Sequence, residues 1–478
     1  MNAAAALLAA GDPAHTALVC GERSVSYAQL AEVVSRVADG LRARGIKPGE
    51  PVLLAADDGI DWVAAHLGTI WAGAVSVPLN PQLAAQRLAQ IARESAARLM
   101  ISDRPHATGI EVCTPAQLSG GESMAAHPVC ADTPALWVHS SGTTSQPKAV
   151  VHAHRAIAGC AAFARDVLQA GPQDRFYASS KLFFAYPLAN SLYAGLALGA
   201  CVILDPRWPE AAAAIATVKA QNATILWSVP SFYYAMLQSG RAGSLRDSSL
   251  LHCVSAGESL PERIADDWHD ATGVGVFGGY GMSETLALVL YREVRREAHA
   301  RLAPLAQLSA HRAAAPGAPC RLWFKHPSVA LGYNRRPDLE QASFRDGWCS
   351  AGDLFYQPLP DRYRFAGRSD DWAKVSGRWV SVLELESQLT QQCRGDIREL
   401  AAAAVTGPEG LSAIALFAVA GKNGAAASQA LLERAGARLP TYQRPRWLHW
   451  VEALPRTDSG KLARAALQAL HRQCLEQQ

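Results

Sequence analysis

Short apolar runs alternate with amphipathic stretches near the start of the chain, and this alternation limits the folds that the sequence can adopt. Residues 51–56 and 74–79 are short and almost entirely apolar, as expected of buried strands, and residues 61–71 between them have a helical pattern. Residues 199–204 and 223–227 predict further strands. Strand, helix and strand in succession are typical of a parallel sheet covered by helices, so we predict an α/β fold.

The composition narrows the class of protein. A chain of 478 residues usually holds roughly two or three domains, and 49% apolar residues can fill large cores. A net charge of +3, without a long basic run, argues against nucleic-acid binding. Ten cysteines without a CxxC pair favour reduced thiols in the cytoplasm. Residues 1–10 lack the basic start of a signal peptide, and no stretch of about 18 apolar residues predicts a membrane span.

A polar loop at residues 140–148 is the first candidate binding site. It reads SSGTTSQPK and lies between two apolar runs, which predicts strand, loop and strand. Small residues let backbone N–H groups turn toward an anion, hydroxyls add donors, and Lys148 adds a positive charge. The spacing differs from the common phosphate-binding loop. Because an exposed turn has the same composition, the loop alone leaves both interpretations open.

Four further positions carry groups suited to a nucleotide. Residues 278–285 form a glycine-rich turn in which Tyr280 could stack on a planar ring, Ser283 could bind a phosphate and Glu284 could ligate Mg²⁺. Asp353 follows a glycine and could hold a ribose diol. Taken singly, each of these residues is more often ordinary turn chemistry, and the lone Lys461 near the end of the chain is more often solvated.

In this order, the motifs resemble the adenylate-forming superfamily of acyl-CoA synthetases, peptide-synthetase adenylation domains and luciferases, over nearly the whole chain. Residues 181–188, 255–258 and 367–377 are most similar to benzoate and 2-aminobenzoate CoA ligases. The resemblance implies a large N-terminal domain of α/β subdomains with a β-rich subdomain, residues 1–369. It also implies a small mobile α+β C-terminal domain, residues 370–478.

The resemblance also implies a two-step reaction. A carboxylate attacks the α-phosphorus of ATP to give acyl-AMP and pyrophosphate, and a thiol then displaces AMP. The expected cofactors are ATP, Mg²⁺ and CoA, and the expected substrate is a small benzoate-like carboxylic acid.

Residue roles follow from the resemblance by position. Lys461 would act as the adenylation lysine, because a cation in a dry site stabilises charge on the transferring phosphate. Lys148 and Glu284, the latter through Mg²⁺, would also be catalytic.

The β- and γ-phosphates would be bound by Ser140, Ser141, Gly142, Thr143, Thr144 and Lys148. The adenine would be framed by Ala256, Gly257, Glu258, Gly279 and Tyr280. The α-phosphate would contact Ser283, and the ribose hydroxyls would contact Asp353 and Arg368.

Other roles concern the thiol step and the acid. Asp370 falls at the hinge about which the C-terminal domain would rotate, bringing Lys374 and Gly377 to the site. Phe184 is expected to gate the thiol tunnel. The ring of the acid would lie in a flat slot lined by Ala185, Tyr186, Gly279, Gly281 and Ala287.

Departures from the family pattern keep alternatives open. Ser145 and Ala149 stand where the family usually has glycines, and Ala287 stands where benzoate-type ligases carry a histidine. The stretch 292–320 is shorter than in the family and lacks the glycine-rich pattern expected there. One alternative is an acyl-AMP ligase that loads the phosphopantetheine of an acyl carrier protein. Another is a non-catalytic sensor of acyl-adenylates.

Overall fold

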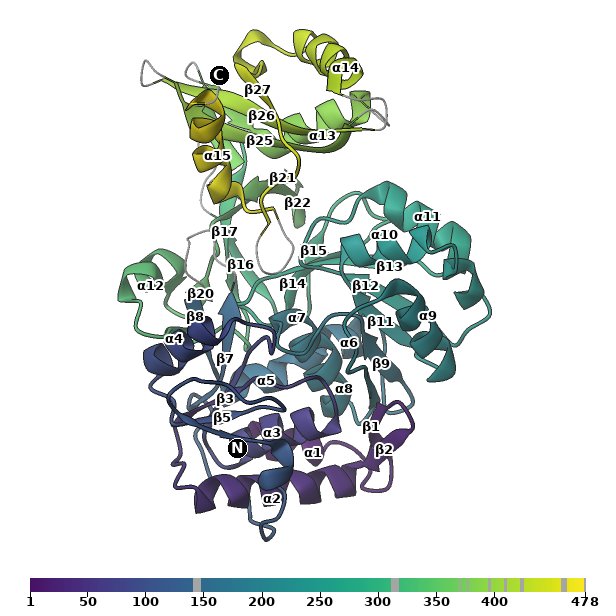
Figure 1. Cartoon of the computed structure of the whole chain (residues 1–478). Coiled ribbons are helices and arrows are strands. Elements are labelled where there is room, and N and C mark those ends of the chain that lie inside the picture. The colour runs from purple at the N-terminus through teal and green to yellow at the C-terminus, as the bar shows by residue number, and fades with distance from the viewer. Residues whose placement is uncertain are drawn as a thin grey trace.

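The computed structural model describes residues 1–140, 148–310, 318–368, 371–375, 378–393, 397–407, 411–421, 425–456 and 462–476. The purple-to-teal part of the chain forms a large body built on two mixed sheets (Figure 1). A smaller C-terminal unit, coloured yellow-green, lies above it, with the green strands of a β-rich region between them (Figure 1). The predicted α/β class with a small C-terminal unit is therefore confirmed. The domain boundary at residues 369–370 lies outside the described residues.

The first sheet has seven strands, in the order β18-β8-β7-β4-β3-β5-β6. Their bounds are β3 Pro51–Leu54, β4 Val75–Pro78, β5 Leu99–Ile101, β6 Glu111–Cys113, β7 Pro134–Ser140, β8 Lys148–Ala153 and β18 Gly332–Tyr333. Strands β3 to β7 run parallel, whereas β8 pairs with both neighbours in the antiparallel sense. The two strands and the helix expected between residues 51 and 79 are confirmed, the helix being α3, Ile60–Trp71.

The second sheet has nine strands, in the order β15-β14-β13-β12-β11-β9-β10-β1-β2. Their bounds are β1 Thr16–Cys20, β2 Arg23–Ser26, β9 Arg175–Ala178, β10 Cys201–Leu204, β11 Ile225–Ser228, β12 His252–Ser255, β13 Val276–Gly281, β14 Leu288–Glu293 and β15 Arg301–Leu302. The strands from β1 through β10, β9, β11 and β12 to β13 are parallel. Their carboxyl ends therefore meet at one edge, where such sheets usually bind ligands.

Helices fill the space between and outside the sheets. The main core combines α1 (Ala3–Leu8), α2 (Tyr27–Ala43) and α3 with α5 (His154–Ala158), α6 (Ala162–Asp166), the π-helix Leu188–Tyr193 and α8 (Ala194–Ala197). The opposite face of the second sheet packs against α9 (Ala211–Ala220), α10 (Pro230–Gln238) and α11 (Glu262–Thr272). Helix α2 begins with a reciprocal capping box between Ser26 and Gln29, which satisfies two free backbone groups.

A β-rich region follows the second sheet. It contains β16 Gln307–Ala310, β17 Cys320–Lys325, β19 Phe344–Arg345, β20 Trp348–Cys349, β21 Asp353–Leu359 and β22 Arg362–Arg368, with α12 Pro337–Ser343 beside it. Phe324, Phe355 and Tyr363 form its buried centre. Strands β15 and β16 come from the stretch 292–320, in which the sequence showed no strand pattern.

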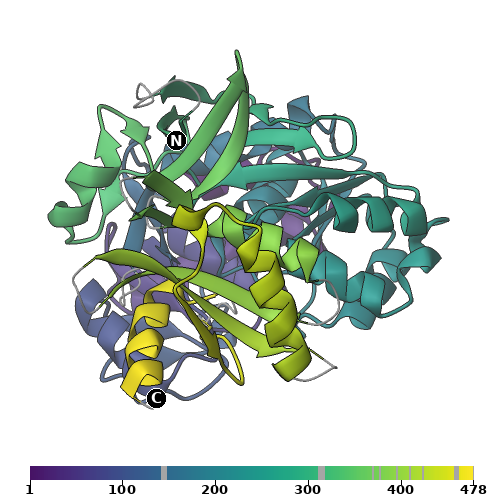
Figure 2. The ribbon, with the colours of Figure 1, turned by 90° about the horizontal axis from the view of Figure 1, so that it is seen from above.

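The C-terminal unit has its own cores around a three-stranded sheet. Its elements are β23 Trp372–Val375, β24 Arg378–Ser381, α13 Val382–Gln392, β25 Ile397–Thr406, β26 Ser412–Ala420, α14 Ala425–Ala437, β27 Trp447–Trp450 and α15 Arg464–Glu476. Seen from above, this unit lies in front of the larger body (Figure 2). Among the described residues, no helix combines the length and the apolar character needed to cross a membrane.

Candidate active site

Lys148, Glu284 and Tyr333 meet where β8, β18 and the turn after β13 come together. Lys148 Nζ lies 3.0 Å from Glu284 Oε1. It also donates a hydrogen bond to the Tyr333 hydroxyl at 2.6 Å, and that hydroxyl donates to Glu284 Oε1 at 2.6 Å. The structure therefore brings together two residues that the sequence assigned to phosphate and Mg²⁺ binding, and it adds a tyrosine.

Glu284 is a buried carboxylate that stays ionised. Burial alone would raise the pKa of its carboxyl group, but the Lys148 charge and the hydrogen bonds from Tyr333 and Lys148 hold that pKa below its ordinary value. Both of these neighbours contact Oε1. In nucleotide sites, Mg²⁺ is usually bound by one or two carboxylates together with the phosphates. Glu284, beside Lys148, could supply such a carboxylate oxygen.

The backbone of the turn that carries Glu284 is fixed from outside. Three consecutive carbonyl oxygens each accept a hydrogen bond from another segment: Ser283 from His152 Nε2 at 2.8 Å, Glu284 from the Ala330 N–H at 2.9 Å, and Thr285 from Ser328 Oγ at 2.5 Å. Burial lowers the pKa of His152 to about 4, so its ring is neutral and its proton lies on Nε2, facing the carbonyl. This arrangement holds Ser283 and Glu284 in place before any ligand arrives.

Asp353 and Arg368, the predicted ribose pair, are also brought together. Arg368 Nη1 lies 3.8 Å from Asp353 Oδ1, and the Tyr280 hydroxyl donates to Asp353 Oδ2 at 2.5 Å. Burial raises the pKa of Asp353 above its ordinary value, while Tyr280 and Arg368 work in the opposite direction. The Tyr280 ring packs among aromatic side chains of the β-rich region, Phe324, Phe355 and Phe365.

The predicted adenine residues follow β12 and lie in β13. Ala256 is buried, whereas Gly257 and Glu258 are exposed at the carboxyl edge of the sheet. Gly257 has a φ of 90°, which residues other than glycine rarely adopt. The turn therefore depends on glycine at this position.

The predicted acid slot lies along residues 184–186 and the turn after β13. The Tyr186 hydroxyl donates to the Val254 carbonyl at 3.0 Å, and its ring meets Trp227 edge-on at 6.1 Å. Phe184 is 37% exposed, Ala185 is half-buried, and Ala287 is buried.

Packing within the protein, apart from any ligand, limits the size of the side chain at two glycines in this region. A Cβ atom at Gly279 would lie 2.7 Å from Leu288 Cδ1, and one at Gly281 would lie 2.7 Å from the Ala287 carbonyl oxygen. The backbone contact therefore requires glycine at Gly281, whereas the Leu288 side chain opposite Gly279 could shift.

Several predicted residues cannot be placed with the others. Lys461, Asp370 and Gly377 lie outside the described residues, as do Ser141, Gly142, Thr143, Thr144 and Ser145. Ser140 and Lys374 are described only as backbone positions, at the end of β7 and within β23.

Tyr333, His152 and Ser328 were missed by the sequence analysis. Tyr333 lies in a two-residue strand, too short to give a pattern, and the other two act through backbone carbonyls of a distant segment.

Comparisons with known proteins agree with the geometry. Residues 6–334 match the family model described as AMP-binding enzyme. A 3-hydroxybenzoate–CoA/4-hydroxybenzoate–CoA ligase from Thauera aromatica is 34% identical over 497 aligned positions, which cover 96% of this chain and 94% of that protein.

Solved structures are similar over nearly the whole length. A benzoate CoA ligase from Burkholderia xenovorans has a TM-score of 0.84 at 28% identity, covering 98% of this chain and 100% of its own. An anthranilate CoA ligase in complex with anthranoyl-AMP has a TM-score of 0.86 at 25% identity, covering 98% of this chain and 97% of its own. The resemblance to aromatic acid CoA ligases is confirmed, and the chain belongs to the family of AMP-binding enzymes.

Proposed function

We propose that this protein is an AMP-forming ligase that joins an aromatic carboxylic acid to CoA. The observation that carries the proposal is the buried, ionised Glu284 beside Lys148, at the site where the family resemblance expects the phosphates of ATP. Relatives that align over nearly their full length are named for hydroxybenzoate, benzoate and anthranilate. These names support a benzoate-like acid as substrate and CoA as acceptor.

In the adenylation step, Lys148 would neutralise charge on the departing pyrophosphate. The Mg²⁺ that the resemblance implies would supply neutralisation of the negative charge on the phosphates at this site. Glu284 would hold the ion through its carboxylate, and Tyr333 and Lys148 keep that carboxylate ionised and oriented. Because the Ser283 backbone is already fixed by His152, its hydroxyl would meet the α-phosphate without a further cost of ordering the backbone.

Asp353 and Arg368 would bind the ribose. The Asp353 carboxylate has the two acceptor oxygens that a diol needs, and Arg368 lies beside it. The Tyr280 hydroxyl holds one of these oxygens and so fixes the orientation of the carboxylate. Lys461 would approach the α-phosphate as the adenylation lysine, and rotation about Asp370 would then exchange it for Lys374 and Gly377.

Phe184, Ala185, Tyr186, Gly281 and Ala287 would surround the acid and the thiol entrance. Tyr186 is anchored to β12 by its hydroxyl, so its ring can form a fixed wall for a flat substrate. We also propose a cytoplasmic location, which is supported by ten cysteines that are all free thiols.

The test is acid-dependent ATP–pyrophosphate exchange, followed by thioester formation. The purified chain is offered Mg²⁺, ATP and a panel of benzoate, hydroxybenzoates, 2-aminobenzoate and alkyl acids. CoA and a holo-carrier protein are then supplied side by side. We expect exchange with an aromatic acid and thioester on CoA. Exchange with none of the acids would end the proposal, and thioester on the carrier protein alone would change the acceptor.

A further inference from the structure

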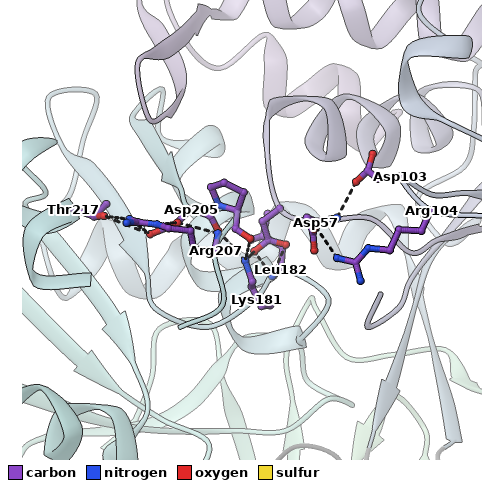
Figure 3. Close-up of polar contacts among 10 residues, drawn as sticks. Asp57, Asp103, Arg104, Lys181, Leu182, Asp205, Arg207 and Thr217 are labelled. Carbon is purple, nitrogen blue, oxygen red and sulfur yellow. Dashed lines mark hydrogen bonds and ion pairs between the residues drawn. The ribbon is translucent and has the colours of Figure 1, made fainter. Parts of the chain in front are cut away.

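A buried ion pair joins the two large sheets next to the predicted acid slot. Asp58, in the loop after β3, and Lys181, just after β9, have side chains that are 7% and 5% exposed, with Lys181 Nζ 3.8 Å from Asp58 Oδ2. Lys181 Nζ also donates to the carbonyl oxygens of Asp205 at 2.8 Å and Pro206 at 3.0 Å (Figure 3). The ammonium therefore connects the carboxyl ends of three strands from two sheets.

Asp58 also holds the backbone of the segment that follows Lys181. The Leu182 N–H donates to Asp58 Oδ2 at 3.1 Å, so one carboxylate receives both the lysine charge and the next backbone N–H. Buried pairs of this kind cost free energy of desolvation that apolar side chains of similar size would avoid. Neither side chain lies in the predicted nucleotide site, so nucleotide binding does not explain why the chain has this buried pair.

The segment fixed by this pair carries Phe183 and Phe184, which form an aromatic cluster with Trp208, a residue that follows β10. The Phe183 and Phe184 ring centroids lie 4.3 Å apart, and the Phe183 and Trp208 centroids lie 6.3 Å apart. Phe184 and Trp208 remain partly exposed. The Phe184 N–H turns back onto the Lys181 carbonyl at 3.0 Å, so the position of Phe184 follows that of Lys181.

The other end of the same segment is anchored separately. Tyr186 is tied to β12 through its own hydrogen bond to Val254. Loss of the Asp58–Lys181 pair would therefore release Phe184 more than it would release Tyr186.

We propose that Asp58 and Lys181 are positioning residues that set the placement of Phe184, and through it the thiol-transfer step. The inference rests on the proposed function, in which Phe184 borders the thiol entrance and Tyr186 borders the acid. It assigns the pair to the second half-reaction, because the acid side of the segment has its own anchor.

A neighbouring ion pair provides a matched control. Asp57 precedes Asp58 in the same loop and pairs with Arg104 at 3.0 Å, with side chains that are 35% and 46% exposed. The Asp57 backbone N–H is bound by Asp103 (Figure 3). Neutralising Asp57 thus removes a carboxylate from the same loop without touching the Leu182 N–H.

The experiment separates the half-reactions in Asp58→Asn, Lys181→Met, the double variant Asp58→Asn/Lys181→Met, Lys181→Arg and the control Asp57→Asn. Adenylation is followed by acid-dependent pyrophosphate exchange, and acyl transfer by single-turnover formation of acyl-CoA from preformed acyl-AMP. We expect each single neutral variant to slow acyl transfer about tenfold and to raise the KM for CoA, since a misplaced group costs rate steeply. Pyrophosphate exchange should change less than about twofold in these variants.

The remaining variants decide between positioning and general stability. Lys181→Arg should recover much of the transfer rate, the double variant should transfer faster than Lys181→Met, and Asp57→Asn should match the wild type in both assays. An equal loss in both half-reactions would overturn the inference. If Lys181→Met does not fold, an unchanged transfer rate in Asp58→Asn would by itself overturn the inference. Wild-type protein that forms acyl-AMP but no acyl-CoA would instead contradict the proposed function.

Discussion

The Tyr333 hydroxyl donates a hydrogen bond of 2.6 Å to Glu284 Oε1. Tyr333 belongs to β18, which pairs with β8, whereas Glu284 follows β13 of the other large sheet. The bond therefore links the two sheets at the site proposed for Mg²⁺ and phosphate. Lys148 donates to the same hydroxyl and also lies 3.0 Å from Glu284 Oε1, so the lysine charge strengthens the hydrogen bond from Tyr333 to the carboxylate.

Replacing Tyr333 with phenylalanine tests this link. A hydrogen bond to a charged group contributes about 1.5–3 kcal/mol, so Tyr333→Phe should weaken Mg²⁺-dependent adenylation roughly tenfold or more. Pyrophosphate exchange, titrated with Mg²⁺ and ATP, measures the effect. Tyr356→Phe is the control, because Tyr356 donates to a different carboxylate, Glu384, at 3.2 Å in an exposed pair. Equal activity of the two variants would remove Tyr333 from the site.

Neutralising either charge of the Lys148–Glu284 pair should cost both activity and stability. Lys148→Met leaves a buried carboxylate without its cation, which typically costs about 3–5 kcal/mol in unfolding free energy. Loss of a group that stabilises transition-state charge should also slow adenylation by about 10²–10³-fold. Urea unfolding and pyrophosphate exchange report the two effects. Arg23→Met, which removes the partner of Asp61 in a pair that is exposed on both sides, should leave both nearly unchanged, and similar losses in both variants would contradict the assignment.

The main sheets could be predicted because their strands are continuously apolar and local in sequence. Residues 51–54, 75–78, 201–204 and 225–228 are strands as their apolar patterns indicated. A different kind of information located Glu284, Lys148, Asp353 and Arg368: motif order over the whole chain, which no single motif supplied. The structure then showed that these residues form two contacting pairs.

The supporting residues could not be predicted, and the reason is physical. His152 and Ser328 bind backbone carbonyls, which every residue has. No sequence pattern therefore identifies these two contacts. Tyr333 reaches Glu284 only because β18 pairs with β8, and a two-residue strand has no periodicity. Asp58 and Lys181 come from different sheets, so their pairing depends on how the sheets pack.

Gly281 should not tolerate even a methyl group. A Cβ atom there would lie 2.7 Å from the Ala287 carbonyl oxygen, and that backbone atom cannot move aside without distorting the turn that carries Glu284. Gly281→Ala should lower the free energy of unfolding by about 1–3 kcal/mol and reduce adenylation. Gly171→Ala, where nothing lies within 4 Å, should change the unfolding free energy by less than about 0.5 kcal/mol. Chemical denaturation compares them, and equal stability would show that the turn can relax.

Acid should destabilise the protein from pH 6.5 downward. Burial lowers the pKa of His66 to about 3 and holds four further histidines near 4, namely His139, His152, His154 and His326. These folded-state pKa values lie below the unfolded value near 6.5, so the unfolded chain binds protons first. Each such histidine should remove up to about 1.4 kcal/mol of unfolding free energy per pH unit between pH 6.5 and 4.

Two buried carboxyls work in the opposite direction. Burial raises the pKa of Asp58 to about 6 and that of Asp353 above its ordinary value, so protonation of either in the folded state adds stability as the pH falls. Five histidines outweigh two aspartates, and the net effect is a loss. Urea unfolding at pH 7.5, 6 and 5 measures it, with His66→Leu as a variant whose pH slope should be shallower. Constant stability across this range would contradict the assignment of neutral buried histidines.

Arg464, at the start of the last helix, links that helix to two acidic residues near the beginning of the C-terminal unit. Its replacement should therefore affect more than its own helix. It pairs with both oxygens of Glu386, at 2.8 and 2.7 Å, and lies 3.1 Å from Asp371 Oδ1. Asp371 Oδ2 in turn accepts the Arg368 backbone N–H at 2.9 Å. The guanidinium therefore connects the last helix to the residue proposed to bind ribose.

Arg464→Met should leave two largely buried carboxylates unpaired and lower the unfolding free energy by about 3–5 kcal/mol. Because Asp371 would then shift, the KM for ATP should rise as well. Arg464→Lys should recover only part of the loss, since an ammonium cannot bind Glu386 with two parallel hydrogen bonds. The control is Arg456→Met, whose pair with Glu399 is more exposed and should contribute less than about 1 kcal/mol. Thermal unfolding and ATP titration distinguish the cases: if Arg464→Met and Arg456→Met unfold at the same temperature with equal KM values, Arg464 does not link the two parts.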